Sequence, residues 1–155
     1  MSRKTISRRI LRTIAFQSLF QLELNPDLEI YQAIQVALDS HEEFNHLFED
    51  IPFDSQEALL EAYPELSYTF KVIDSVVTNK EAIDQKISQL STGWSIDRIV
   101  RMDLVLLRMA IAEMEYLEDE DVPKAVALNE ALEISKVYSD EKSSKFINGV
   151  LSNLV

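Results

Sequence analysis

Hydrophobic residues return every three or four positions along most of the chain, which is the spacing of amphipathic α-helices. Polar breaks containing Pro, Gly or Asn divide this pattern into separate segments. The predicted helices cover residues 7–24, 30–38, 66–90, 96–116 and 123–137, and a closing helix follows a polar break at 139–144. Only two glycines and four prolines are present, a scarcity that favours helices over hairpins. We therefore predict an all-α fold.

The predicted helix over 96–116 is the most apolar one, and we expect it to lie at the centre of the core. Its candidate core residues are Ile99, Val100, Leu104, Leu107 and Ile111. Residues 39–64, in contrast, are acidic and interrupted by Pro52 and Pro64, so we expect a loop with short helical pieces there. The length of 155 residues is that of one domain.

Charge is distributed unevenly along the chain. The formal net charge of -12 taken alone argues against a nucleic-acid partner, because carboxylates repel phosphates. The first twelve residues nevertheless hold five basic side chains and no acid, whereas residues 13–70 contain no Lys or Arg. This distribution suggests two partners: a polyanion that binds the basic N-terminal end, and a basic protein that binds the acidic remainder of the chain. The alternative is that both features only serve solubility.

Several kinds of chemistry find no support in the sequence. The absence of cysteine excludes disulfides, thiolate metal sites and cysteine nucleophiles, and no glycine-rich phosphate loop is present. His41 and His46 are five residues apart, so on a helix they diverge by about 140° and cannot share a metal. We therefore predict that the protein is not an enzyme and that it binds no cofactor and no metal. Without a signal-like or membrane-spanning apolar run, we expect a soluble, cytoplasmic protein.

The first predicted helix brings arginines and aromatic residues to one side. On a helical wheel Leu11, Ala15, Ser18 and Leu22 form a core stripe. Within about 120° on the opposite side lie Arg8, Arg9, Arg12, Phe16 and Phe20. Arginine forks can hold phosphates while aromatic rings stack splayed bases, which suits single-stranded RNA, and Arg3 and Lys4 extend the positive charge. The alternative is that the two phenylalanines belong to the core.

Four segments in conserved order resemble the NusB family. Residues 122–136, VPKAVALNEALEISK, are similar to its pattern VPxxVAINEAVELAK, and residues 141–151, EKSSKFINGVL, to its ExSxKFVNGVL. Residues 107–114 resemble its LRxAxxEL, and residues 12–20 resemble its RxxAxQxLY. Phe20 stands where a Tyr is common, which keeps the ring but loses a hydroxyl donor. The acidic segment 39–64 is longer than usual.

The resemblance implies about seven helices in two small bundles packed across each other, an N-terminal half of about 1–65 and a C-terminal half of about 66–155. It implies binding of single-stranded boxA RNA in nascent ribosomal RNA leaders together with NusE, a small-subunit ribosomal protein. It also implies contact with the RNA polymerase elongation complex and other Nus factors. The residues it assigns to RNA are Arg8, Arg9, Arg12, Phe20, Lys142, Lys145 and Phe146. Asp97 and Asp103 fall at acidic positions that would face NusE.

Three other functions stay open. The acidic balance would also suit a helical protein-interaction module without RNA binding. A NusB-like segment can recruit RNA for a ribosomal RNA methyltransferase, but this chain lacks the glycine-rich methyltransferase fold. The last is a metal-dependent enzyme without a recognisable motif. A homodimer that covers Phe16 or Phe20 would compete with RNA.

Overall fold

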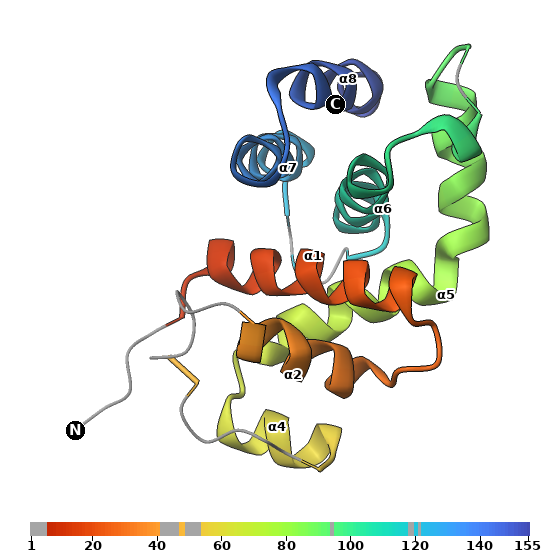
Figure 1. Cartoon of the computed structure of the whole chain (residues 1–155). Helices are drawn as coiled ribbons and strands as arrows, with labels where there is room; N and C mark the ends of the chain where they lie inside the picture. Colours follow the sequence, from red (N-terminus) through yellow and green to blue (C-terminus); the bar gives the residue numbers. More distant parts are fainter. Residues whose placement is uncertain (1–5, 41–46, 49–53, 94, 118–119, 121) are drawn as a thin grey trace. The chain divides into compact units, whose positions relative to one another are not determined.

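The computed structural model describes residues 6–40, 47–48, 54–93, 95–117, 120 and 122–155. Every regular element in this part of the chain is helical, which confirms the predicted all-α fold (Figure 1). The seven α-helices described there are α1 (Arg8–Leu24), α2 (Ile30–Ser40), α4 (Gln56–Ala62), α5 (Leu66–Leu90), α6 (Arg101–Glu115), α7 (Lys124–Tyr138) and α8 (Glu141–Leu151). Short 3-10 helices include η1 (Ile96–Arg98) and η3 (Ser152–Leu154). Among the described helices, none is both long and apolar enough to cross a membrane.

The chain divides into two compact units, Met1–Asp74 and Ser75–Val155, so α5 contributes to both. Shortly after this boundary the backbone of Asn79 leaves helical geometry, with φ -108° and ψ 16°. The Asn79 side-chain amide donates to the Ser75 carbonyl at 2.9 Å, which gives that carbonyl a partner at the kink. The packing of one bundle across the other stays a prediction.

In the first unit α1 packs against α2, and α2 packs against α4 (Figure 1). The Ser7 hydroxyl caps α1 by accepting a hydrogen bond from the Ile10 backbone N–H at 3.2 Å. Thr69 of α5 donates its hydroxyl to the Leu11 carbonyl at 2.9 Å, which fixes the start of α5 against α1. Large, fully buried apolar side chains fill this unit, among them Ile14, Ile34, Leu38, Leu59 and Leu66.

The middle of α1 is buried on more sides than one stripe. Every side chain from Ile14 to Leu19 is buried, including Phe16, which the wheel placed opposite the core. Ser18 donates its hydroxyl to the Ile14 carbonyl at 2.7 Å and so needs no partner outside the helix. The single core stripe is therefore wrong for this segment, because a wheel shows which residues share a face but not how many neighbours cover the helix.

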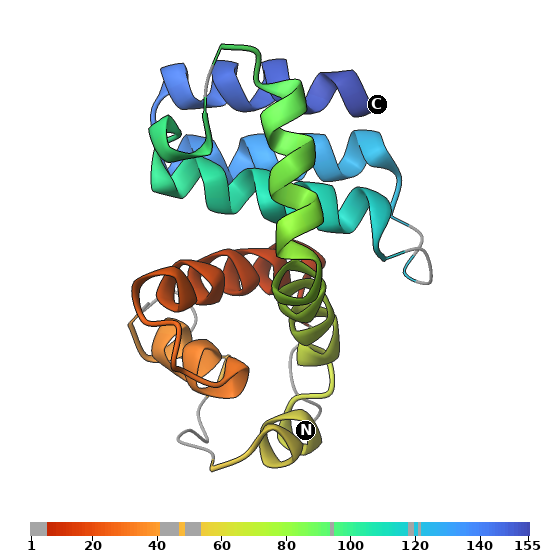
Figure 2. The same ribbon diagram turned by 90° about the vertical axis from the view of Figure 1, so that its right-hand side faces the viewer.

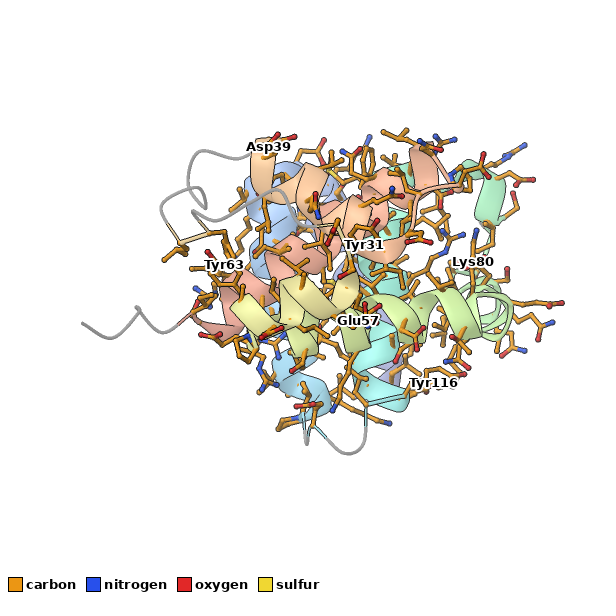
Figure 3. The ribbon with its side chains drawn as sticks, turned by 90° about the horizontal axis from the view of Figure 1, so that it is seen from below. Tyr31, Asp39, Glu57, Tyr63, Lys80 and Tyr116 are labelled. Carbon is orange, nitrogen blue, oxygen red and sulfur yellow. The ribbon has the colours of Figure 1, made fainter. Side chains whose placement is uncertain are left out.

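Helix α4 confirms the short helical piece expected within 39–64. Its N-cap is Ser55, whose hydroxyl accepts from the Ala58 backbone N–H at 3.1 Å. The starts of α2 and α4 border a hollow of about 460 Å³, and Figure 3 labels two of its lining residues, Tyr31 and Glu57. Glu29 and Asp54 also line it, so this hollow is acidic.

In the second unit α6 is the central helix and packs against α7 and α8 (Figure 2). Every residue from Asp103 to Met114 is buried, which confirms the expected core role of this helix. Arg108 attaches α6 to α5, since its Nε and Nη2 donate to the two Asp84 carboxylate oxygens at 2.8 and 2.9 Å. Lys86 of α5 lies 2.6 Å from a Glu115 carboxylate oxygen.

The segment before α6 differs from the prediction of one helix over 96–116. After η1, Ile99 and Val100 are extended, with ψ of 131° and 133°, and α6 begins only at Arg101. Val100 is 61% exposed, so its predicted place in the core is wrong, whereas Ile99 is buried. Both residues are β-branched and favour extended backbone, and hydrophobic spacing alone does not register such a break.

Candidate nucleic-acid interface

The N-terminal end of α1 carries two exposed arginines, Arg8 and Arg9, directly after the Ser7 cap. The first turn of this helix contains no acidic residue. Because the N-terminal end of a helix is the positive end of its dipole, two cations there oppose the dipole, and a bound anion would relieve that opposition. The local charge therefore suits a phosphate group.

Arg8 lies on an aromatic ring that the sequence did not single out. Its guanidinium carbon is 3.8 Å from the centroid of Tyr68, a residue in the first turn of α5 that is only 3% exposed. The guanidinium carbon of Arg12 is 5.7 Å from the same centroid. Stacking uses the flat face of a guanidinium, whereas its N–H donors lie in the plane, so a stacked arginine can still donate to a phosphate.

Two residues predicted to meet RNA are buried. Arg12 is 4% exposed and Phe16 is 2% exposed. Phe16 therefore presents no ring face to a base, and the Arg12 guanidinium has no surface for a phosphate to approach. This burial counts against direct contact, and contact of either residue with RNA stays a prediction. Phe20, farther along α1, is half-buried and keeps part of its side chain at the surface.

The N-terminal end of α8, in the second unit, carries the other basic residues that were predicted to bind RNA. Its cap is Asp140, whose carboxylate accepts from the Ser143 backbone N–H at 2.8 Å. Lys142 and Lys145 are exposed and Phe146 is half-buried. Lys145 lies 3.5 Å from the Glu141 carboxylate, in a pair so exposed that it contributes little to stability.

A hollow of about 320 Å³ in the second unit lies beside this end of α8. It is lined by Arg98, Ile99, Val100, Asp103, Asp140, Lys142, Ser143 and Phe146. Burial raises the pKa of Asp103, the nearby Asp140 charge adds to the rise, and a hydrogen bond from the Ser143 side chain partly opposes it. The Asp103 Oδ1 atom is buried without a hydrogen-bond partner.

Asp103 and Asp97, both predicted to face a basic protein partner, lie in different surroundings. Asp103 is 4% exposed, which counts against direct contact of its carboxyl with a partner, and that contact stays a prediction. Asp103 lies instead near Ser143 of α8, and both residues line the same hollow. Asp97, in η1, is exposed, and its contact with a partner stays a prediction.

Comparison with known families places the chain. The family model described as "NusB family" matches residues 9–155. The chain belongs to the NusB family. A relative from Listeria monocytogenes serotype 4a, named transcription antitermination protein NusB, is 40% identical over 149 residues, covering 96% of each chain. An Enterococcus faecalis relative of the same name is 39% identical, covering 100% of this chain and 93% of its own.

Solved NusB structures share the fold. T. maritima NusB matches with a TM-score of 0.72 and 29% identity, covering 97% of this chain and 92% of the other. A chain from a structure described as antitermination factors NusB and NusE in complex with dsRNA matches with a TM-score of 0.70 and 26% identity. That match covers 95% of this chain and 94% of the other.

For this NusB-family chain, sequence reasoning found the exposed arginines and missed the ring beneath them. Tyr68 follows Arg8 by sixty positions, and no motif links the two, so only the packing of α5 on α1 brings them together. Arg98, which lines the hollow beside α8, was also missed. The predicted contacts of Arg3 and Lys4, and the positions of His41, His46 and Trp94, lie outside the described residues. Within the described part, no group of three or more His, Asp or Glu is placed to hold a metal ion.

Proposed function

We propose that this protein is an RNA-binding transcription antitermination factor. It binds boxA-type single-stranded RNA in nascent ribosomal RNA leaders together with NusE, and joins the RNA polymerase elongation complex with other Nus factors. It acts by binding and not by catalysis, in the cytoplasm where transcripts are made. The observation that carries the proposal is the pair of exposed arginines, Arg8 and Arg9, on the acid-free N-terminal turn of α1. The names of the relatives support the same activity.

On α1 the arginines bind phosphates and Phe20 offers an apolar contact to a base. Arginine forks hold phosphate oxygens in charge-assisted hydrogen bonds, which are about twice as strong as neutral ones. Arg3 and Lys4 precede the helix in the sequence and add positive charge for the approach of RNA. Lys142, Lys145 and Phe146 form a second basic and aromatic element, which belongs to α8.

The acidic body of the protein suits the second partner. NusE is a ribosomal protein and thus expected to be basic, whereas this chain has a net charge of -12 and no Lys or Arg in residues 13–70. Opposite charges favour association and steer it. Asp97, exposed in η1, is one acidic residue for this contact. Two weak RNA contacts joined in one complex raise the effective affinity without new chemistry.

The test is fluorescence anisotropy of a short boxA RNA, with and without purified NusE, at several salt concentrations. Neutralising three or four phosphates should give a slope of log K against log salt of about -2 to -3. Binding should tighten with NusE and weaken with a scrambled strand. The experiment should also include a double-stranded RNA of the same sequence, since a structural relative was solved with dsRNA. A flat salt dependence contradicts the proposal.

A protein-interaction module without RNA binding is the second candidate, and the acidic balance favours it. It predicts NusE binding by calorimetry with no effect of any RNA. A homodimer that covers Phe20 would instead make the RNA affinity depend on protein concentration.

A further inference from the structure

Tyr68 occupies an unusual position for a buried tyrosine. Its ring is 3% exposed, and the side chain that lies on it, Arg8, is itself exposed. The buried ring thus lies directly beneath an arginine at the surface. Arg12, four residues after Arg8 and therefore one helical turn away, approaches the same ring from the buried side of α1.

The ring is held firmly in place. The next residue, Thr69, is fully buried and donates its hydroxyl to the Leu11 carbonyl at 2.9 Å, so the first turn of α5 is anchored to the helix that carries both arginines. Leu66 and Phe70 on either side of Tyr68 are buried as well. A ring fixed in this way provides a rigid surface on which a guanidinium can stack.

We propose that Tyr68 is a positioning residue for RNA binding, whose ring orients the Arg8 guanidinium before RNA arrives. This inference rests on the proposed function. The electron-rich face of the ring attracts the guanidinium and restrains its long side chain, while the in-plane N–H donors stay directed away from the ring. Less conformational entropy is then lost when the fork meets a phosphate. The negative ring face also eases the approach of two like charges, Arg8 and Arg12, at the positive end of α1.

The test is a double-mutant cycle on RNA affinity. Tyr68→Phe keeps the ring and should leave affinity within about twofold of the wild type, whereas Tyr68→Leu keeps apolar bulk but removes the π face and should weaken binding about three- to tenfold. In the R8A background the effect of Y68L should largely disappear, because the side chain that the ring orients is absent. An equal effect of Y68L in both backgrounds would overturn the proposal.

Arg8→Lys is the second variant, and it leaves the ring untouched. A lysine keeps the charge but lacks both the planar face and the fork of donors, so it should weaken RNA binding at least as much as Y68L does. Thermal unfolding of each variant shows whether the first unit stays folded. If Y68L does not fold, R8K decides alone: full affinity with lysine at this position contradicts orientation by stacking.

A spectroscopic readout tests the stack without RNA. Ring-current shifts and slowed exchange of the Arg8 Nε–H should be seen by NMR in the wild type and in Y68F, and should be lost in Y68L. Unchanged Arg8 signals in Y68L would overturn the stacking on which the inference rests. A wild-type protein that binds no RNA would overturn the proposed function itself, whereas RNA binding that ignores Y68L and R8K would overturn only the role of Tyr68.

Discussion

The N-terminal ends of α1 and α8, which carry the residues proposed to meet RNA, are built in opposite ways. The first turn of α1 has a neutral serine cap, no acid and two exposed arginines. The first turn of α8 has an aspartate cap and Glu141, which pairs with Lys145. The α8 end follows the electrostatic preference of a helix, whereas the α1 end opposes it. Sequences violate such local rules chiefly where function requires it, so the comparison favours α1 as the main anion-binding end.

The largest effect should come from removing the two exposed arginines of α1. The double variant R8A/R9A loses charge-assisted contacts with phosphate, so its RNA dissociation constant should rise at least about tenfold. Removing like charges from the positive end of the helix favours folding by about 0.3–1 kcal/mol, but losing the Arg8–Tyr68 contact costs a similar amount, so the unfolding free energy should change little. Anisotropy and thermal denaturation measure the two effects.

The matched control is K142A/K145A, which removes the same charge from α8. Its dissociation constant should rise less than about fivefold, because Asp140 and Glu141 lower the positive potential at this end, whereas the first turn of α1 contains no acid. Equal losses of affinity in the two double variants would remove the functional difference between the helix ends.

Asp103, which lies against the α8 end, adds a third acid to Asp140 and Glu141 there, and its burial leads to a prediction about pH. Its pKa in the folded protein is raised above the ordinary value of 3.8, chiefly by burial. The folded state therefore holds this proton more tightly than the unfolded state, and the stability so gained is present below 3.8 and lost as pH rises through the raised pKa. Asp103→Asn should be more stable than the wild type at neutral pH, and the difference should shrink as the solution is acidified.

The thermal midpoint followed against pH measures this difference. Asp97→Asn is the control, because that side chain is exposed and a surface substitution typically changes stability by less than about 0.5 kcal/mol. A midpoint of D103N that runs parallel to the wild type at every pH would show that the buried carboxyl carries no such cost.

A single substitution can make the α1 end resemble the α8 end. Ser7→Asp keeps a good helix cap and adds a negative charge beside Arg8 and Arg9. The unfolding free energy should rise by about 0.3–1 kcal/mol while RNA affinity falls by about two- to fivefold. Ser7→Asn caps equally well without charge and is the control. Improved RNA binding by S7D would contradict a phosphate site at this end.

Local signals explain which helices the sequence predicted well. α1 begins after its Ser7 cap and ends before Asn25-Pro26, and α5 has the predicted bounds. Both were predictable because helix caps, prolines and hydrophobic periodicity are local features of the sequence. The extended Val100 was missed, because its apolar side chain continues the helical spacing although its backbone is extended.

The candidate site was predictable only in part, for a different reason. The cluster of arginines is visible in the sequence, but Arg12, Phe16 and Asp103 are buried by elements distant along the chain. The residue types of Arg12 and Asp103 do not indicate such burial, because charged residues are exposed on average. Tyr68 illustrates the same limit, because its proposed role depends on a contact between two helices that are distant along the chain and that no motif links.

The smallest effect expected is at the Glu141–Lys145 pair of α8. Glu141→Gln releases Lys145 and removes a negative charge, so RNA affinity should rise, by no more than about twofold, while the unfolding free energy falls by no more than about 0.5 kcal/mol. The same change in the K145A background separates the released lysine from the general loss of negative charge. A gain in affinity that persists there would be long-range electrostatics, and it would vanish at high salt. A gain that needs Lys145 would show that α8 binds RNA weakly because its own acid holds its lysine, and that the two helix ends differ in degree and not in kind.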